Sequence, residues 1–207
     1  MLRHRLRLGR LEDKVRKGTG VRRVAALLVG GTIGVENDGN SAEGVPNVLD
    51  PPKRVCLYLV QHGEAVAEAV DPNRPLSVHG RTVVEQMAAW AVRRGVRVDQ
   101  IRHSGKLRAE QTARIFDAQF CPRGGVSLPP GLAPNDDVQP LADGAEGWPD
   151  SLMLVGHLPF LSRLASLLLI GDPGRPVIQF CNGGLVGLVR DERDWAIVCV
   201  IPPVLIG

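Results

Sequence analysis

The sequence has no apolar run near the roughly 18 to 20 residues that a membrane-spanning helix requires. Its four cysteines lie far apart and form no C-x-x-C pair, which argues against a zinc site and against a dithiol redox motif. Hydrophobic residues make up 44% and charged residues 23% of the 207 residues, so the chain is far from disordered or fibrous composition. We therefore expect a globular, cytoplasmic protein whose cysteines act as small buried residues, with no membrane partner.

Aromatic residues are absent from residues 1–50, although this stretch is rich in positive charge. Residues 1–23 hold nine Lys or Arg and two acidic residues, and an apolar run follows at 24–35. A basic segment before an apolar one is typical of export signals, but no small-x-small cleavage site follows. Without aromatic side chains to stack on bases, only nonspecific attraction to nucleic acid is expected. We interpret residues 1–50 as a flexible, basic and partly apolar extension, with export as the alternative.

From residue 54 onward, strand and helix patterns alternate. Strand-like apolar runs occupy residues 55–60, 100–103, 151–155, 185–190 and 195–201, with a weaker one at 126–128. Helical patterns occupy residues 78–94, which Ser77 can cap, residues 106–119 and the apolar stretch after His157, while 135–146 is either a short helix or a loop. This alternation predicts an α/β domain over residues 54–203, a three-layer sandwich with a mainly parallel central sheet and helices on both faces.

Two of the predicted strands end beside a glycine and a histidine. The first continues into Gln61, His62 and Gly63, and the run at 151–155 continues into Gly156 and His157. The carboxyl ends of parallel strands share one edge of a sheet, which is where open α/β proteins bind their ligands. We therefore expect the two histidines to lie near one another.

Four motifs resemble, in the same order, those of the histidine phosphatase superfamily. They are Q-H-G-E at 61–64, N-R-P-L-S at 73–77, L-R-A-E-Q-T at 107–112 and V-G-H-L-P at 155–159. Within that superfamily the chain is similar to the short, single-domain SixA-type phosphohistidine phosphatases, over about residues 54 to 201. The resemblance implies a phosphoglycerate-mutase-like fold. It also implies that His62 is the nucleophile that becomes phosphorylated, with Arg74, Arg108 and His157 around the phosphate.

The chemistry of phosphoryl transfer accounts for these residue types. The transferred group spreads negative charge over three oxygens, so it needs fixed cations and hydrogen-bond donors. Arg108, in the first turn of its helix, adds its charge to the positive end of the helix dipole. His62 must attack as a neutral imidazole, Gly63 lets the backbone pass close to the phosphate, and His157 would donate most strongly as an imidazolium. No metal and no other cofactor is expected.

Gln61 stands where the family has an arginine. A glutamine amide can still donate a hydrogen bond to phosphate, but it brings no charge and no planar fork. Removing one good transition-state donor commonly costs about 10²- to 10³-fold in rate. The sequence therefore leaves two outcomes open, a working phosphatase for a reactive substrate or a catalytically weak module that binds phosphate or a phosphoprotein.

The leaving group bears on the substrate. An alkyl phosphate needs a carboxylic acid to protonate the departing oxygen, for which Glu64, Asp71 and Glu110 are candidates. The imidazole of a phosphohistidine can carry its own proton, and the chain lacks long insertions that would enclose a small substrate. We therefore expect a phosphohistidine-bearing protein, such as a phosphocarrier domain, as the partner, with a small phosphometabolite as the alternative.

Several further residues are expected near the rim of the pocket or away from it. His103, Ser104, Gly105 and Lys106 end the second strand and can line the rim. The Asn182-Gly183-Gly184 stretch is typical of a tight turn before a strand, and the family resemblance implies that this turn borders the pocket. His79 is expected at the surface.

Overall fold

The computed structural model describes residues 55–191 and 194–206. The extension expected at residues 1–50 lies outside the described residues. A six-stranded sheet in the order β3-β2-β4-β1-β5-β6 forms the centre of the fold. The strands are β1 (Val55–Gln61), β2 (Gln100–His103), β3 (Val126–Ser127), β4 (Ser151–Gly156), β5 (Leu185–Asp191) and β6 (Asp194–Ile201). The first four run parallel, whereas β5 pairs antiparallel with β1 and β6 antiparallel with β5.

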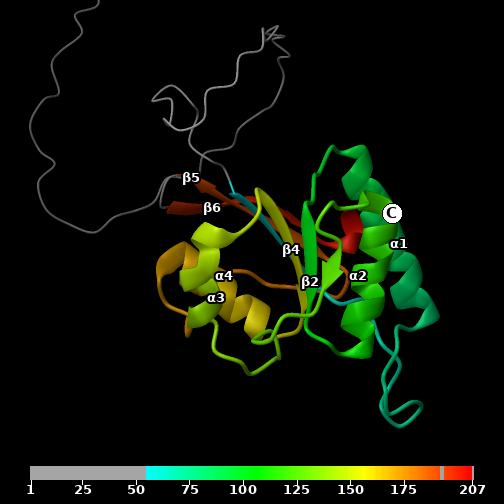
Figure 1. The fold of residues 1–207 in the computed structure, drawn as a ribbon. Coiled ribbons are helices and arrows are strands. Elements are labelled where there is room, and N and C mark those ends of the chain that lie inside the picture. Colours follow the sequence, from blue (N-terminus) through cyan, green and yellow to red (C-terminus); the bar gives the residue numbers. More distant parts are fainter. Residues whose placement is uncertain (1–54, 192–193, 207) are drawn as a thin grey trace, which may run out of the picture.

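Helices cover both faces of this sheet. The helices are α1 (Val78–Arg93), α2 (Leu107–Phe120), α3 (Gln139–Asp143) and α4 (Phe160–Ile170), with short 3-10 turns η1 (Gly144–Gly147) and η2 (Pro203–Leu205). Helices α1 and α2 lie on one side of the sheet, and α3 and α4 lie on the other (Figure 1). The predicted three-layer, mainly parallel architecture is confirmed. The uncertain region at 135–146 contains α3 and η1.

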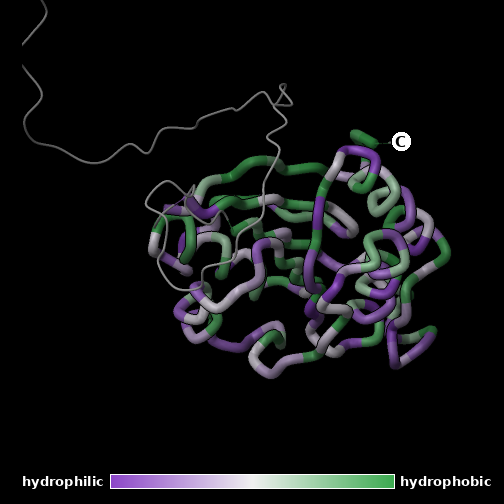
Figure 2. The backbone as a smooth tube through the Cα atoms, turned by 45° about the horizontal axis from the view of Figure 1, so that its top comes forward, coloured by the Kyte–Doolittle hydropathy of each residue, from purple (hydrophilic) through white to green (hydrophobic). Residues whose placement is uncertain are grey.

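Strand β1 is central because both of its faces are buried. Leu57 and Leu59 belong to the core under α3 and α4, while Val60 belongs to the core under α1 and α2. This is the burial expected of a strand inside a parallel sheet, which favours a continuous apolar run over strict alternation. In Figure 2 the strands run as largely hydrophobic segments through the middle of the molecule.

The ends of the helices follow local sequence signals. Ser77 caps α1 by accepting a hydrogen bond from the backbone N–H of Gly80 at 2.9 Å. Gly95, with φ of 76°, follows the last turn of α1.

No helix among the described residues is long and apolar enough to cross a membrane. The prediction of buried cysteines is wrong for Cys121 and Cys181, which are exposed, because both lie in loops rather than in strands.

One edge of the sheet collects the loops that carry the motifs. The four parallel strands end there, and β5 begins there because Leu185 pairs with Val60. The segments after β1, β2, β3 and β4, together with the segment before β5, therefore meet at this carboxyl edge.

Gly80 is a packing requirement in this arrangement. A Cβ atom at Gly80 would overlap the backbone of Glu64, in the loop after β1. We expect Gly80→Ala to lower the free energy of unfolding by about 1 to 3 kcal/mol, since overpacking outweighs the roughly 1 kcal/mol gained from helix propensity. Urea unfolding of the full chain measures this change. Gly147→Ala is the control, because its Cβ would meet no atom within 4 Å, and equal stability of the two variants would contradict the packing argument.

Candidate active site

The two glycine–histidine strand ends meet at the carboxyl edge. Gln61 at the end of β1 is paired with Gly156 at the end of β4, and the backbone N–H of His62 donates to the Gly156 carbonyl at 3.1 Å. The imidazole rings of His62 and His157 lie 4.6 Å apart, centre to centre, at an angle of 57°. The structure thus brings together the two histidines that the strand pattern singled out.

The tautomer of His62 follows from its two hydrogen bonds. Its Nδ1 lies 2.7 Å from the Gly63 carbonyl oxygen, which can only accept, so Nδ1 carries the proton. Nε2 then has a lone pair, and Arg108 Nε donates to it at 3.2 Å. Burial lowers the pKa of His62, and the charges of Arg108 and Arg74 lower it further, against the opposing effect of the bond to Gly63. His62 is therefore a neutral imidazole with its free nitrogen facing a guanidinium.

His157 is held more deeply than His62. Its side chain is only 4% exposed, and its Nε2 has no hydrogen-bond partner among the described residues. Burial, followed by the neighbouring His62, Arg108, Lys106 and Arg74, lowers the pKa of His157 to about 3. His157 is therefore neutral in the free protein, because burial and then the surrounding cations disfavour a further positive charge.

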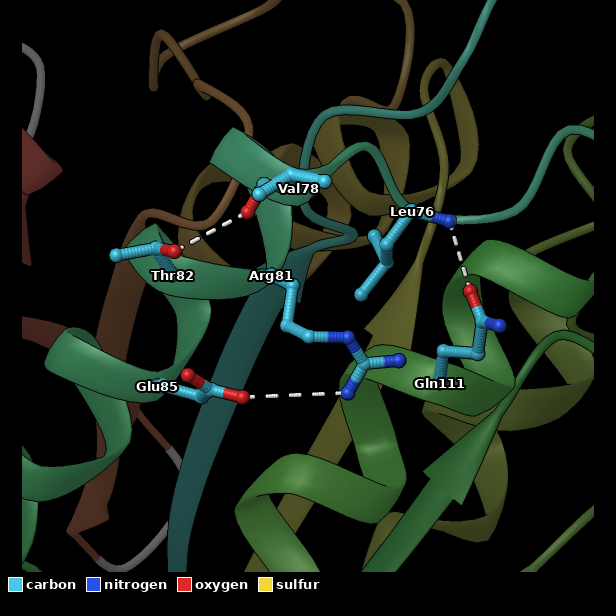
Figure 3. Close-up of polar contacts among 6 residues, drawn as sticks. All are labelled: Leu76, Val78, Arg81, Thr82, Glu85 and Gln111. Atoms are coloured by element: carbon cyan, nitrogen blue, oxygen red, sulfur yellow. Dashed lines mark hydrogen bonds and ion pairs between the residues drawn. The ribbon is translucent and has the colours of Figure 1, made fainter.

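Arg74 is positioned by a loop that closes on itself. Ala65 forms an isolated bridge with Leu76, and the N–H of Val66 donates to the Pro75 carbonyl at 2.9 Å. Gln111 Oε1, on α2, accepts from the N–H of Leu76 at 2.7 Å, as Figure 3 shows. Arg74 itself has φ of 51°, and its buried Nε has no hydrogen-bond partner among the described residues. The glutamine of the L-R-A-E-Q-T motif is thus a clamp on the segment that carries Arg74.

Figure 3 also shows the α1 side chains that lie near Gln111. Arg81 and Glu85, one turn apart on α1, form an ion pair at 3.9 Å on the surface next to Gln111. Both side chains are about half exposed, so this pair contributes little to stability.

Gly63 has a reason to be glycine within the protein itself. A Cβ atom there would meet Val84 Cγ2 at 2.7 Å and the Gly80 carbonyl oxygen at 2.9 Å, both on α1. Its N–H donates to Thr112 Oγ1 at 3.0 Å, and that hydroxyl donates to the Arg108 carbonyl at 2.8 Å. Thr112, which is fully buried, thereby couples the backbone after His62 to the helix turn that carries Arg108.

Gln61 is joined to the turn before β5. Its Nε2 donates to Asn182 Oδ1, while its Oε1 is buried without a hydrogen-bond partner among the described residues. The N–H of Gly183 donates to the Gln61 carbonyl at 2.9 Å. The Asn182-Gly183-Gly184 turn therefore borders the two histidines, as expected, and it holds the residue that stands in place of the family arginine.

The candidate acids do not converge on the histidines. Glu64 Oε1 accepts from Ser77 Oγ at 2.7 Å, and Asp71 Oδ1 accepts from the N–H of Asn73 at 2.8 Å. Glu110 lies 3.9 Å from Arg114 in a groove between α1 and α2. Glu68 is the carboxylate whose charge acts on Arg108 and opposes the lowering of its pKa. The sequence offered no signal for Glu68, because it lies outside the four motifs.

Of the residues expected at the rim of the pocket, Lys106 acts on the histidine pair, whereas His103 lies among residues of α2. Lys106 is exposed and its charge acts on His157. His103 is buried, and its Nδ1 accepts from the N–H of Gly105 at 3.2 Å. Its charged neighbours are Glu110 and Arg114, on α2. His79 is exposed on α1, as expected. Within the described part of the chain, no group of three His, Cys, Asp or Glu residues could hold a metal ion.

Known proteins were compared with this chain at the levels of sequence and fold. No family model matches it. The phosphohistidine phosphatase SixA of Escherichia coli (strain K12) is 28% identical over 142 residues, which cover 66% of this chain and 86% of that protein. A structure of the protein histidine phosphatase SixA complexed with tungstate matches with a TM-score of 0.64 at 24% identity, covering 74% of this chain and 100% of that one. The alpha-ribazole phosphatase of Shigella flexneri matches with a TM-score of 0.59 at 15% identity, covering 72% of this chain and 97% of that one.

The structural matches establish the fold of this chain. The match to SixA adds similarity in sequence to one curated phosphatase. This sequence match extends over most of the curated relative. In the structure, three of the motif segments meet at His62, because Arg108 donates to its Nε2 and His157 lies beside its ring. The relatives that this comparison finds are phosphatases. In sequence the chain is similar to the phosphohistidine phosphatase SixA, and it shares the fold of the SixA structure.

Proposed function

We propose that this protein is a phosphohistidine phosphatase that removes phosphate from a histidine of another protein through a phosphorylated His62. The observation that carries the proposal is the fixed tautomer of His62, whose Nδ1 donates to Gly63 and whose Nε2 keeps a lone pair. Arg108, Arg74 and His157 would act on the phosphoryl oxygens, and Gln61 and Gly63 would line the pocket. The relative named phosphohistidine phosphatase SixA supports the same chemistry. In this proposal the catalytic domain spans residues 54–203, and residues 1–50 form an extension to it.

The reaction would proceed in two displacements at phosphorus. In the first, Nε2 of His62 forms a bond to phosphorus while the P–N bond to the substrate histidine breaks, and the departing imidazole keeps the proton that it carries. In the second, a water oxygen attacks the phosphorus of phosphorylated His62, the N–P bond breaks and the electron pair returns to Nε2. The released proton of the water passes to a phosphate oxygen or to solvent, and phosphate leaves.

The cationic groups would act where the charge develops. Arg108 donates to Nε2 of His62, so an entering phosphoryl group would compete for that donor and draw the guanidinium onto its oxygens. His157 would give one neutral N–H, and Arg74 would supply its buried Nε–H, which has no partner among the described residues. No step in this scheme needs a carboxylic acid, which agrees with the engagement of Glu64 with Ser77.

A small phosphometabolite is the second candidate substrate, and Glu68 favours it. Among structures of the same fold are an alpha-ribazole phosphatase and a phosphoserine phosphatase in complex with phosphoserine. Alkyl phosphates of this kind need a proton donor. Glu68, whose charge acts on Arg108, would be that acid in preference to Glu64 or Glu110.

Trapping of the covalent intermediate tests the proposal. We expect the full chain, mixed with a histidine-phosphorylated protein carrying ³²P, to show transient label on His62 followed by free phosphate. His62→Ala should show neither label nor release, whereas the control His79→Ala, at an exposed histidine of α1, should behave as the wild type. Binding without label or release would establish the catalytically weak binding module instead. Release from phosphoserine but not from phosphohistidine would favour the small-substrate alternative.

Gln61→Arg measures what the missing charge costs. If Gln61 acts as a neutral donor to phosphate, an arginine should raise the single-turnover rate by up to about 10²-fold, since charge-assisted donors are stronger. The control Asn182→Ala releases Gln61 from its partner without adding charge. A rate that is unchanged or lower in Gln61→Arg would mean that the site has no use for a cation at this position.

The pH profile tests the electrostatic assignment. Because burial and two arginines lower the pKa of His62, the acid limb of kcat/KM, which reports the free enzyme, should lie below the usual histidine value of about 6.5. Arg74→Gln removes one of those charges, so the acid limb should move to higher pH in addition to any loss of rate. Arg81→Gln, at an exposed arginine of α1, is the control. An acid limb that stays in place in Arg74→Gln would contradict the role of Arg74 near the nucleophile.

A further inference from the structure

An apolar hollow is formed by the start of α4, just after His157, and by the segment that precedes the Asn182 turn. It has a volume of about 540 Å³ and is lined by seven residues, none of them charged. Leu158, on one wall, is the residue after His157, and Val177 and Phe180 lie on the other wall. Leu158 and Val177 remain 42% and 40% exposed. Exposed aliphatic side chains gathered around a hollow indicate a contact surface rather than scattered surface residues.

Both walls of the hollow lead into the candidate active site. The first wall begins at Leu158, where α4 starts just after His157. The second wall, 176–180, continues into Asn182 and Gly183, which hold Gln61 through its side chain and its carbonyl. A ligand that fills the hollow and a phosphoryl group at His62 would therefore lie next to each other, the first in apolar and the second in cationic surroundings.

Exposed aliphatic residues also stand on the opposite side of the histidine pair. Leu128 is 59% exposed and follows β3, and Val70 is 78% exposed in the loop after β1. Strand β3 is three positions from β1 in the sheet, and β5 is one position beyond β1 on the other side. At about 4.8 Å per strand, the edge from β3 to β5 measures about 19 Å. A small phosphometabolite cannot cover such a width, but the surface of a protein can.

We propose that the hollow receives an apolar side chain of the phosphohistidine-bearing protein, close to its phosphohistidine, and so selects protein substrates. This inference rests on the proposed function, because it assumes that the phosphoryl group is delivered to His62. The absence of charge from the lining sets the chemistry of the contact: an aliphatic or aromatic side chain of the partner gains by burial there, and a charged one does not. A central apolar contact with a polar surround is the usual anatomy of a specific protein interface.

Neutral polar substitutions test the hollow without placing a negative charge near the phosphate. We would compare Leu158→Gln and Val177→Gln with the control Val198→Gln, an exposed aliphatic residue on β6. The substrates are a phosphocarrier protein phosphorylated on histidine and phosphoramidate, which contains the same kind of P–N bond without a protein. We expect each hollow variant to raise KM for the phosphorylated protein about tenfold or more, with a much smaller change in kcat/KM for phosphoramidate, and Val198→Gln to match the wild type. Equal losses on the two substrates would overturn the proposal.

Binding of the same phosphorylated protein to His62→Ala separates this inference from the proposed function. If the wild type shows no turnover while Val177→Gln still weakens binding in the His62→Ala background, the docking site is supported and the enzyme proposal is rejected. Turnover of phosphoramidate with no measurable binding of the phosphocarrier protein would reject the docking site and leave the phosphatase. Size-exclusion chromatography of the wild type and Val177→Gln tests the competing occupant, and a dimer lost on substitution would assign the hollow to a second copy of the chain.

Discussion

The register between β1 and β4 is the constraint on which the site depends. Gln61 lies opposite Gly156, so the residues that follow, His62 and His157, leave the sheet at the same level and face one another. A slip of one residue would turn every side chain of a strand to the opposite face, which would also expose Leu57 and Leu59 to the wrong core. The apolar burial that fixes the strand thus fixes the distance between the histidines, without any direct bond between their rings.

Electrostatic repulsion is the second organising factor. Burial lowers the pKa of both histidines, and the charges of Arg108 and Arg74 lower both further, with Lys106 also acting on His157, so both histidines are neutral among cations. An anion with several oxygens would relieve this repulsion, which is what the proposed function requires of the site when phosphate enters. A further arginine at position 61 would increase the repulsion in the free protein. Glutamine instead joins Asn182 and adds no positive charge to the site.

Much of this arrangement could be predicted from local patterns, and the remainder depends on tertiary contacts. The strand ends, the Ser77 cap and the position of Arg108 in the first turn of α2 follow from periodicity and capping rules. The neutral state of His157 could not be predicted, because it results from burial and from cations on separate segments. Glu110 was a candidate acid by its place in a motif, but helix geometry turns it toward Arg114. Gly63 was expected to make room for phosphate, and the structure adds a need for room under α1.

The hydrogen bonds of Glu64 and Asp71 bear on which substrate the site could accept. Glu64 binds the hydroxyl that caps α1, and Asp71 closes its own loop through Asn73. Either carboxylate would have to abandon a structural bond to protonate a leaving group, which would cost stability in each turnover. A leaving imidazole that carries its own proton makes no such demand. The same edge of the sheet is wide and bears exposed aliphatic residues on both sides of the histidines, as a site that reads a protein surface would require. Glu68, whose charge acts on Arg108, keeps an acid available for the small-substrate alternative, so the proposed protein substrate rests mainly on the shape and exposed aliphatic residues of this edge.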